Sequence, residues 1–143
     1  MVDDLPHEPE HAIEVQLPFL QRTGGPSLEV LPVAVGVSRA DEIADLIGAL
    51  LPTALVVVST DLSHYHDDAT AKRLDRRTAD AVLARDPDAI GPEDACGRYA
   101  LRGLAEFARR AELDVRLLDL RTSADTAGDP GRVVGYGTFA LGG

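Results

Sequence analysis

The residues best suited to chemistry lie in one polar segment, 59–68, which follows a short apolar run at 55–58. Within it, Asp61 and His64 place a carboxylate and an imidazole three residues apart. Ligands in open α/β sheets bind beyond the carboxyl ends of strands, where a carboxylate can stabilise a charged imidazole or orient a metal-ligating one. We therefore predict a site around Asp61 and His64. The alternative is a loop whose polar side chains satisfy backbone groups.

Two other patterns overlap this segment. His64 and His66 form an HxH pair, which in extended backbone would face one side and could hold a metal. Ser59, Asp61 and His64 contain the residue types of a hydrolase triad, and a generic α/β hydrolase stays an alternative. The sequence has no G-x-S-x-G elbow, and triad residues normally come from distant segments. Both patterns are therefore weaker than the pairing of Asp61 with His64.

Cys96 is the single cysteine of the chain, so neither an internal disulfide nor a CxxC redox pair can form within it. We expect it near the start of a helix that opens after Pro92, where the positive helix end favours a thiolate, both a nucleophile and a metal ligand. Gly97 would allow a substrate to approach closely. The alternative is a small buried apolar residue.

The pattern of apolar residues predicts the elements that position these groups. Helices are expected at 10–22, 39–51, from 67 or 68 to 85, and from Pro92 to 111; strands are expected at 28–37, 55–58, 115–120 and 133–141. The runs at 28–37 and 55–58 are almost wholly apolar, as in buried strands. The alternation predicts one α/β domain over 1–143, with a mainly parallel or mixed sheet and helices on both faces. The last strand pair is the one that can be antiparallel.

Composition narrows the partners and the location. The net charge is −10, from 24 acidic and 14 basic residues, which argues against nucleic acid and against an anionic membrane surface. Apolar runs stay well short of the roughly 20 residues that a membrane helix needs, and the acidic start does not resemble a signal peptide. Together with the lone thiol, this predicts a cytoplasmic protein.

Several segments, taken together, resemble the Memo family, the B component of the AmmeMemoRadiSam system. They are EHAIEVQLPFLQ at 10–21, STDLSHY at 59–65, ACGR at 95–98, RTS at 121–123 and VVGY at 133–136. Each is weak alone. Their order and their spread over nearly the whole chain make the resemblance specific.

The resemblance implies a fold similar to the class III extradiol dioxygenases (LigB-like), which use non-haem iron. It places His64, Cys96 and Asp61 in the pocket as catalytic residues, with Cys96 and His64 as metal ligands. Iron or copper is the implied metal, and the complete family fold would be a dioxygenase-like metal-dependent redox protein. An unknown small molecule and the other AmmeMemoRadiSam components are the implied partners.

Family members are about twice this length, and their first half supplies further pocket histidines. We therefore expect this chain to correspond to the C-terminal half. With one cysteine, one mapped histidine and one carboxylate, it should bind metal weakly or not at all, since tight sites have three or four protein ligands. We also expect low stability and self-association through an unpaired sheet edge. The alternative functions are a non-catalytic ligand- or protein-binding module and an inactive fragment.

Overall fold

The computed structural model describes residues 11–25, 27–126 and 128–142. The chain forms two compact units, Met1–Gly36 and Val37–Gly143. Each unit is described by itself below. The candidate site residues all belong to the second unit, and the single domain over 1–143 stays a prediction.

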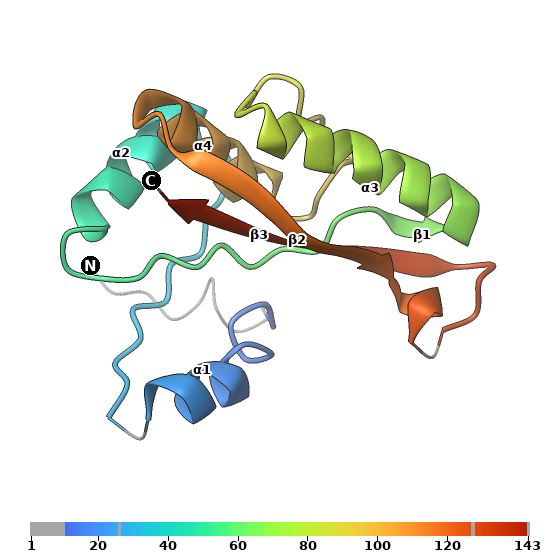
Figure 1. Cartoon of the computed structure of the whole chain (residues 1–143), viewed down its shortest axis with the longest axis horizontal. Helices are drawn as coiled ribbons and strands as arrows, with labels where there is room; N and C mark the ends of the chain where they lie inside the picture. Colours follow the sequence, from blue (N-terminus) through green and yellow to red (C-terminus); the bar gives the residue numbers. More distant parts are fainter. Residues whose placement is uncertain (1–10, 26, 127, 143) are drawn as a thin grey trace. The chain divides into compact units, whose positions relative to one another are not determined.

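Among the described residues of the first unit, 17–24 form the helix α1 (Leu17–Gly24), drawn in blue in Figure 1. Pro18 lies in its first turn, where the missing N–H is not needed. The predicted helix from residue 10 therefore begins later, after a series of turns, and Glu10 itself lies outside the described residues. His11 Nδ1 lies 2.9 Å from Glu14 Oε2, and both side chains are exposed, as expected for solvated charges.

The second unit is built on a three-stranded antiparallel sheet with the order β1-β3-β2. Its strands are β1 (His64–His66), β2 (Asp114–Thr122) and β3 (Val133–Gly142). β2 and β3 pair along most of their length and form the long twisted ribbon of Figure 1. The α/β class and the antiparallel pairing of the last two strands are confirmed.

The prediction of a mainly parallel sheet is wrong for the described part of the chain. The runs at 28–37 and 55–58 have no regular secondary structure, and Val37 and Leu55 are 89% and 83% exposed. A strand is stable when its backbone groups pair with a neighbour. Apolar, β-branched composition favours that pairing but does not provide it, and neither run has a ladder partner among the described residues.

Three helices accompany the sheet: α2 (Ala40–Leu50), α3 (Asp68–Leu83) and α4 (Arg98–Arg110). α3 begins as predicted, because the Asp67 carboxylate accepts the Thr70 N–H at 3.0 Å. α2 is capped one residue after Ser38, at Arg39. None of the described helices is long and apolar enough to cross a membrane.

Helices α3 and α4 share one hydrophobic core with the sheet (Figure 1). The core contains Leu62, Ala81, Val82, Ile90, Ala95, Leu101 and Ala105, with Leu120 and Phe139 packed against it from β2 and β3. On the same two strands, Leu118 and Tyr136 are 60% and 43% exposed. In the described part of this unit, helices therefore cover one face of the sheet. The prediction of helices on both faces is wrong for this part of the chain.

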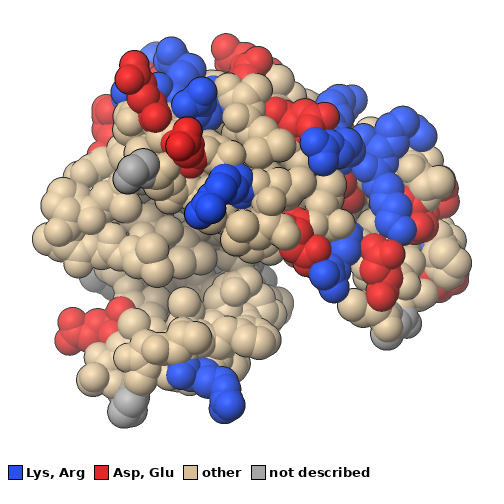
Figure 2. Space-filling view, in the orientation of Figure 1, with Lys and Arg blue, Asp and Glu red and all other residues tan. Residues whose placement is uncertain are grey.

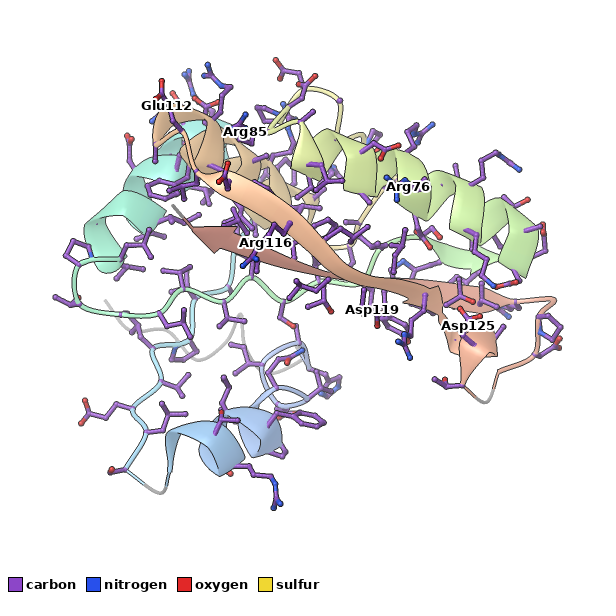
Figure 3. All side chains as sticks on the ribbon, in the orientation of Figure 1. Arg76, Arg85, Glu112, Arg116, Asp119 and Asp125 are labelled. Carbon is purple, nitrogen blue, oxygen red and sulfur yellow. The ribbon has the colours of Figure 1, made fainter. Side chains whose placement is uncertain are left out.

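Charged side chains of both signs are intermixed on the face shown in Figure 2. On α3, Arg76, which Figure 3 labels on this helix, pairs with Asp80 at 2.7 Å. Asp125, labelled in Figure 3, lies in the short 3-10 helix η1 (Ser123–Asp125). Its Oδ1 is 3.1 Å from Lys72 Nζ. Basic side chains that are paired with carboxylates, in a chain with a net charge of −10, do not form the positive patch that attracts a polyanion.

Candidate metal centre

The polar loop that carries the candidate residues is fastened to β3 by backbone hydrogen bonds. Leu62 N donates to Gly135 O at 2.9 Å, and Gly135 N donates to Ser63 O at 2.9 Å. Leu62 and Ser63 are 2% and 1% exposed. Leu62 and Ser63 thus form a buried, hydrogen-bonded anchor, with Asp61 just before it and His64 just after it.

Asp61, His64 and Cys96 come together at this loop. One ligand atom from each of the three lies within 4.8 Å of the other two, and His64 Nε2 is 3.5 Å from Asp61 Oδ2. The His64 side chain is 30% exposed, the Asp61 side chain 48%, and Cys96 is exposed. The predicted approach of His64 and Cys96 is found, and the group is open to solvent. Their roles in catalysis and metal binding stay predictions.

Cys96 lies just before α4, close to the helix start as expected, with Gly97 as the N-cap. Its N–H donates to Asp61 O at 3.3 Å, and its sulfur lies 3.2 Å from Thr60 Oγ1. Gly97 was expected to admit a substrate, but a Cβ there would lie 2.8 Å from Thr60 Oγ1. The glycine therefore makes room for Thr60, a residue whose contact with Cys96 the sequence did not reveal.

The HxH pair lies in irregular backbone, not in the regular extended strand that would put both histidines on one side. Tyr65 has a φ of 63°, which is uncommon outside glycine, and the pairing with β3 is irregular between His64 and His66. The alternation of an extended strand is thereby broken. His66 is not part of the group of converging donor atoms.

Asp75, on α3, accepts a hydrogen bond from the backbone of the loop and was not singled out from the sequence. Its Oδ1 accepts the Ser63 N–H at 2.9 Å, and the residue is 1% exposed. Burial raises the pKa of the Asp75 carboxyl, while the contacts with Ser63 and the charges of His64 and His66 oppose that rise. Asp75 Oδ2 and Ser63 Oγ are buried without a hydrogen-bond partner among the described residues.

One sequence signal could have identified Asp75. It lies four residues after Ala71 and three before Thr78, which are both buried, so it shares the inward stripe of α3. A carboxylate on such a stripe needs a partner inside the protein. Gly135 is adjacent to it, and a Cβ at that position would overlap Asp75 Oδ2.

Tyr136, the residue after Gly135, lies close enough to Asp61 to sense its charge. Its pKa is raised by burial and, secondarily, by the negative charge of Asp61. The side chain is 43% exposed, so the phenol is available to a ligand near Asp61. The sequence had identified Tyr136 only as part of a motif.

The spacing of Asp61 and His64 matches that of two ligands on one metal ion. With metal–ligand distances of about 2.0–2.3 Å, the ligand atoms of one tetrahedral ion lie about 3.3–3.8 Å apart, and the Asp61–His64 separation of 3.5 Å falls in that range. Imidazole, thiolate and carboxylate are ligands of zinc, iron and copper. Three protein ligands with an open position are typical of catalytic metal sites, not of closed structural ones.

In this α/β unit, Asp61 lies just before β1, His64 begins β1, and Cys96 lies just before α4. Comparison with known proteins gives the family. Residues 1–140 match the family described as Memo-like protein. This chain belongs to that family.

Relatives with the name "MEMO1 family protein" support the assignment. The chain is 30% identical to one from Desulfurococcus amylolyticus over 94% of its own length and 52% of the relative. It is 32% identical to one from Methanosarcina acetivorans, over 97% and 57%, and 36% identical to one from Thermotoga neapolitana, over 94% and 51%. The chain thus spans about half the length of the curated relatives that it matches.

Proposed function

We propose that this chain supplies Asp61, His64 and Cys96 as metal ligands in a metal-dependent oxidoreductase of the Memo-like family, with iron or copper as the metal. The observation that carries the proposal is the convergence of the three ligand atoms within 4.8 Å. Residues from two loops, 35 positions apart between Asp61 and Cys96, meet at one solvent-open point. A fold similar to the class III extradiol dioxygenases is part of the same proposal.

The chemistry of the donors supports a redox metal. A thiolate and an imidazole together suit copper and iron, and an open coordination position leaves room for a substrate. When bound, the metal would supply electron transfer and polarisation of a substrate oxygen. Asp61, 3.5 Å from His64 Nε2, either completes the ligand set or fixes the imidazole orientation. The Tyr136 phenol would contact a small-molecule substrate beside Asp61.

The surroundings of the site also shape the proposal. Because Cys96 is exposed, its role as a ligand requires a reducing compartment that keeps the thiol free, and we place the protein in the cytoplasm. Family membership makes the other AmmeMemoRadiSam components the natural macromolecular partners. The substrate is a small molecule that reaches the open side of the donor group.

Metal binding tests the proposal. The chain is dialysed against Cu⁺, Fe²⁺ or Zn²⁺ under reducing, anaerobic conditions, and bound metal is measured per chain. In line with the small ligand set, we expect weak binding of at most one ion per chain, lost in Cys96→Ala and His64→Ala, and unchanged in the matched control His66→Ala. Three protein ligands make us expect weaker binding than at a four-ligand structural zinc site. Stoichiometric binding that survives Cys96→Ala would contradict the proposal.

Turnover separates an enzyme from a binding module. Metal-loaded protein is mixed with a simple reductant such as ascorbate, and oxygen consumption is followed. We expect consumption above that of the free metal, dependent on Cys96. A metal-loaded protein without any turnover would favour the non-catalytic alternative.

A further inference from the structure

Thr60 Oγ1 lies at the centre of the contacts around Cys96. It accepts the Gly97 N–H at 2.7 Å, lies 3.0 Å from Asp61 O as a donor, and lies 3.2 Å from Cys96 Sγ. Among the described residues, no other side chain is hydrogen-bonded to that sulfur, whose second contact is Asp61 O at 3.8 Å. The hydroxyl therefore links the loop, the helix start and the thiol.

We propose that Thr60 is a positioning residue: its hydroxyl donates a hydrogen bond to the Cys96 sulfur when that sulfur is a metal ligand, and so sets the strength of the metal–sulfur bond. This inference rests on the proposed function, because it concerns the metal-bound state of Cys96. It adds a residue to the site that the ligand set does not contain.

The direction of the hydrogen bond follows from counting protons. A threonine hydroxyl has one proton to donate and lone pairs to accept, and the Gly97 N–H already occupies a lone pair. The proton can point to Asp61 O or to Cys96 Sγ. A metal-bound thiolate has no proton, so in that state only Thr60 can donate across the 3.2 Å contact.

When the Thr60 hydroxyl turns toward the sulfur, the Asp61 carbonyl still has a hydrogen-bond donor. Asp61 O still accepts the Cys96 N–H at 3.3 Å, so its backbone oxygen keeps a donor when Thr60 turns away. Gly97 holds the oxygen of Thr60 in place through its N–H, and its lack of a Cβ permits the close approach. Only the proton of Thr60 has to move.

A hydrogen bond to a metal-bound thiolate withdraws electron density from the sulfur. Hydrogen bonding around a cysteine ligand is known to tune metal centres in this way, and the loss of an outer hydrogen-bond partner typically weakens metal binding by about 10- to 100-fold. Without the Thr60 proton, the sulfur should be a stronger electron donor in a less well-oriented site.

The test uses Co²⁺ as a spectroscopic probe in the full chain. Co²⁺ bound to a thiolate gives a sulfur-to-metal charge-transfer band, and its energy reports electron donation from sulfur. We compare wild type with Thr60→Val, which removes the hydroxyl, with Thr60→Ser, which keeps it, and with Thr53→Val. Thr53 is a matched control because its hydroxyl bonds only Leu50 O in an exposed turn.

The expected result is a band at longer wavelength in Thr60→Val, with about 10-fold weaker Co²⁺ binding, and wild-type spectra in Thr60→Ser and Thr53→Val. If Thr60→Val does not fold, judged by circular dichroism, Thr60→Ala takes its place. A band that is unmoved in Thr60→Val, or moved equally in Thr60→Ser, overturns the inference and leaves the metal site standing. The absence of the band in wild type overturns both the site and the inference.

Discussion

Two neighbouring stretches of the chain, 55–58 and 59–64, contrast in burial and in hydrogen bonding. The first is the more apolar, yet Leu55 and Val57 are 83% and 52% exposed, and neither stretch has regular secondary structure before His64. The second is polar, yet its backbone is bonded to β3 and to the buried Asp75. Order in this part of the chain therefore follows hydrogen-bond partners and not hydrophobicity. Asp61 and His64 of the candidate site belong to the stretch 59–64, whose backbone is hydrogen-bonded.

The largest effect on stability should come from adding a side chain at Gly135, where β3 lies against Asp75. In Gly135→Ala, the added methyl group would overlap the Asp75 carboxylate and push apart β3 and the loop anchor. Overpacking of this kind typically costs 1–3 kcal/mol, and we expect a loss of about 3 kcal/mol in the free energy of unfolding, measured by urea denaturation. Gly142→Ala, on the same strand with open space around it, should change stability by less than about 0.5 kcal/mol. Equal effects of the two changes would contradict the account.

Removal of the anchoring carboxylate should have the next largest effect. Asp75→Ala leaves the buried Ser63 N–H without its acceptor, and an unsatisfied buried donor costs about 1–3 kcal/mol. We expect a loss of about 2 kcal/mol and faster amide exchange at Ser63, measured by hydrogen–deuterium exchange. A variant with wild-type protection at Ser63 would show that the loop does not depend on Asp75.

The pH dependence of the free energy of unfolding reports the effect of ionising the Asp75 carboxyl. The pKa of Asp75 is raised in the folded protein, so folding favours its protonated form. As pH rises from the unfolded-state value, about 3.9, through the raised folded value, the wild type loses stability because ionisation is easier when unfolded. Asp75→Asn cannot ionise, so its stability relative to wild type should increase over this interval and then stay constant.

Urea denaturation of both proteins between pH 4 and pH 8 measures this difference. The matched control is Asp80→Asn, since Asp80 is exposed on the same helix. A difference between Asp75→Asn and wild type that is flat with pH, or that falls as pH rises, would contradict a raised pKa at Asp75.

Sequence reasoning found the parts of the site that local chemistry determines. Asp61 and His64 lie three residues apart in one polar segment, so their types and spacing indicated a site, and the family resemblance added Cys96 to it. Thr60 and Asp75 were missed as contacts because their roles depend on distances across the fold, 36 residues from Thr60 to Cys96 and 12 from Ser63 to Asp75. Such pairings are not encoded in the spacing of neighbouring residues.

The fold shows the same division between local and long-range information. The helices α2, α3 and α4 were predicted because periodicity and capping residues are local signals. The sheet direction was mispredicted because it depends on which backbone a strand pairs with. The runs at 28–37 and 55–58 carry the composition of buried strands, but the described residues provide them with no partner.

The smallest effect on stability should come from the exposed stretch. Leu55→Ser alters a side chain that is 83% exposed, so the free energy of unfolding should change by less than about 0.5 kcal/mol. Self-association should nevertheless decrease, because an exposed apolar segment with free backbone groups favours pairing with another copy. Sedimentation velocity of wild type and variant measures this. A monomeric wild type that melts above about 65 °C, the upper end for mesophile domains, would contradict the expectation of a weakly stable, associating chain.

The central claim, that Asp61, His64 and Cys96 hold one metal, is tested most directly by X-ray absorption spectroscopy of the zinc-loaded chain. The account predicts one sulfur at about 2.3 Å and nitrogen and oxygen ligands at about 2.0–2.2 Å, with the sulfur absent in Cys96→Ala. A first shell of oxygen and nitrogen alone in the wild-type protein would contradict the claim.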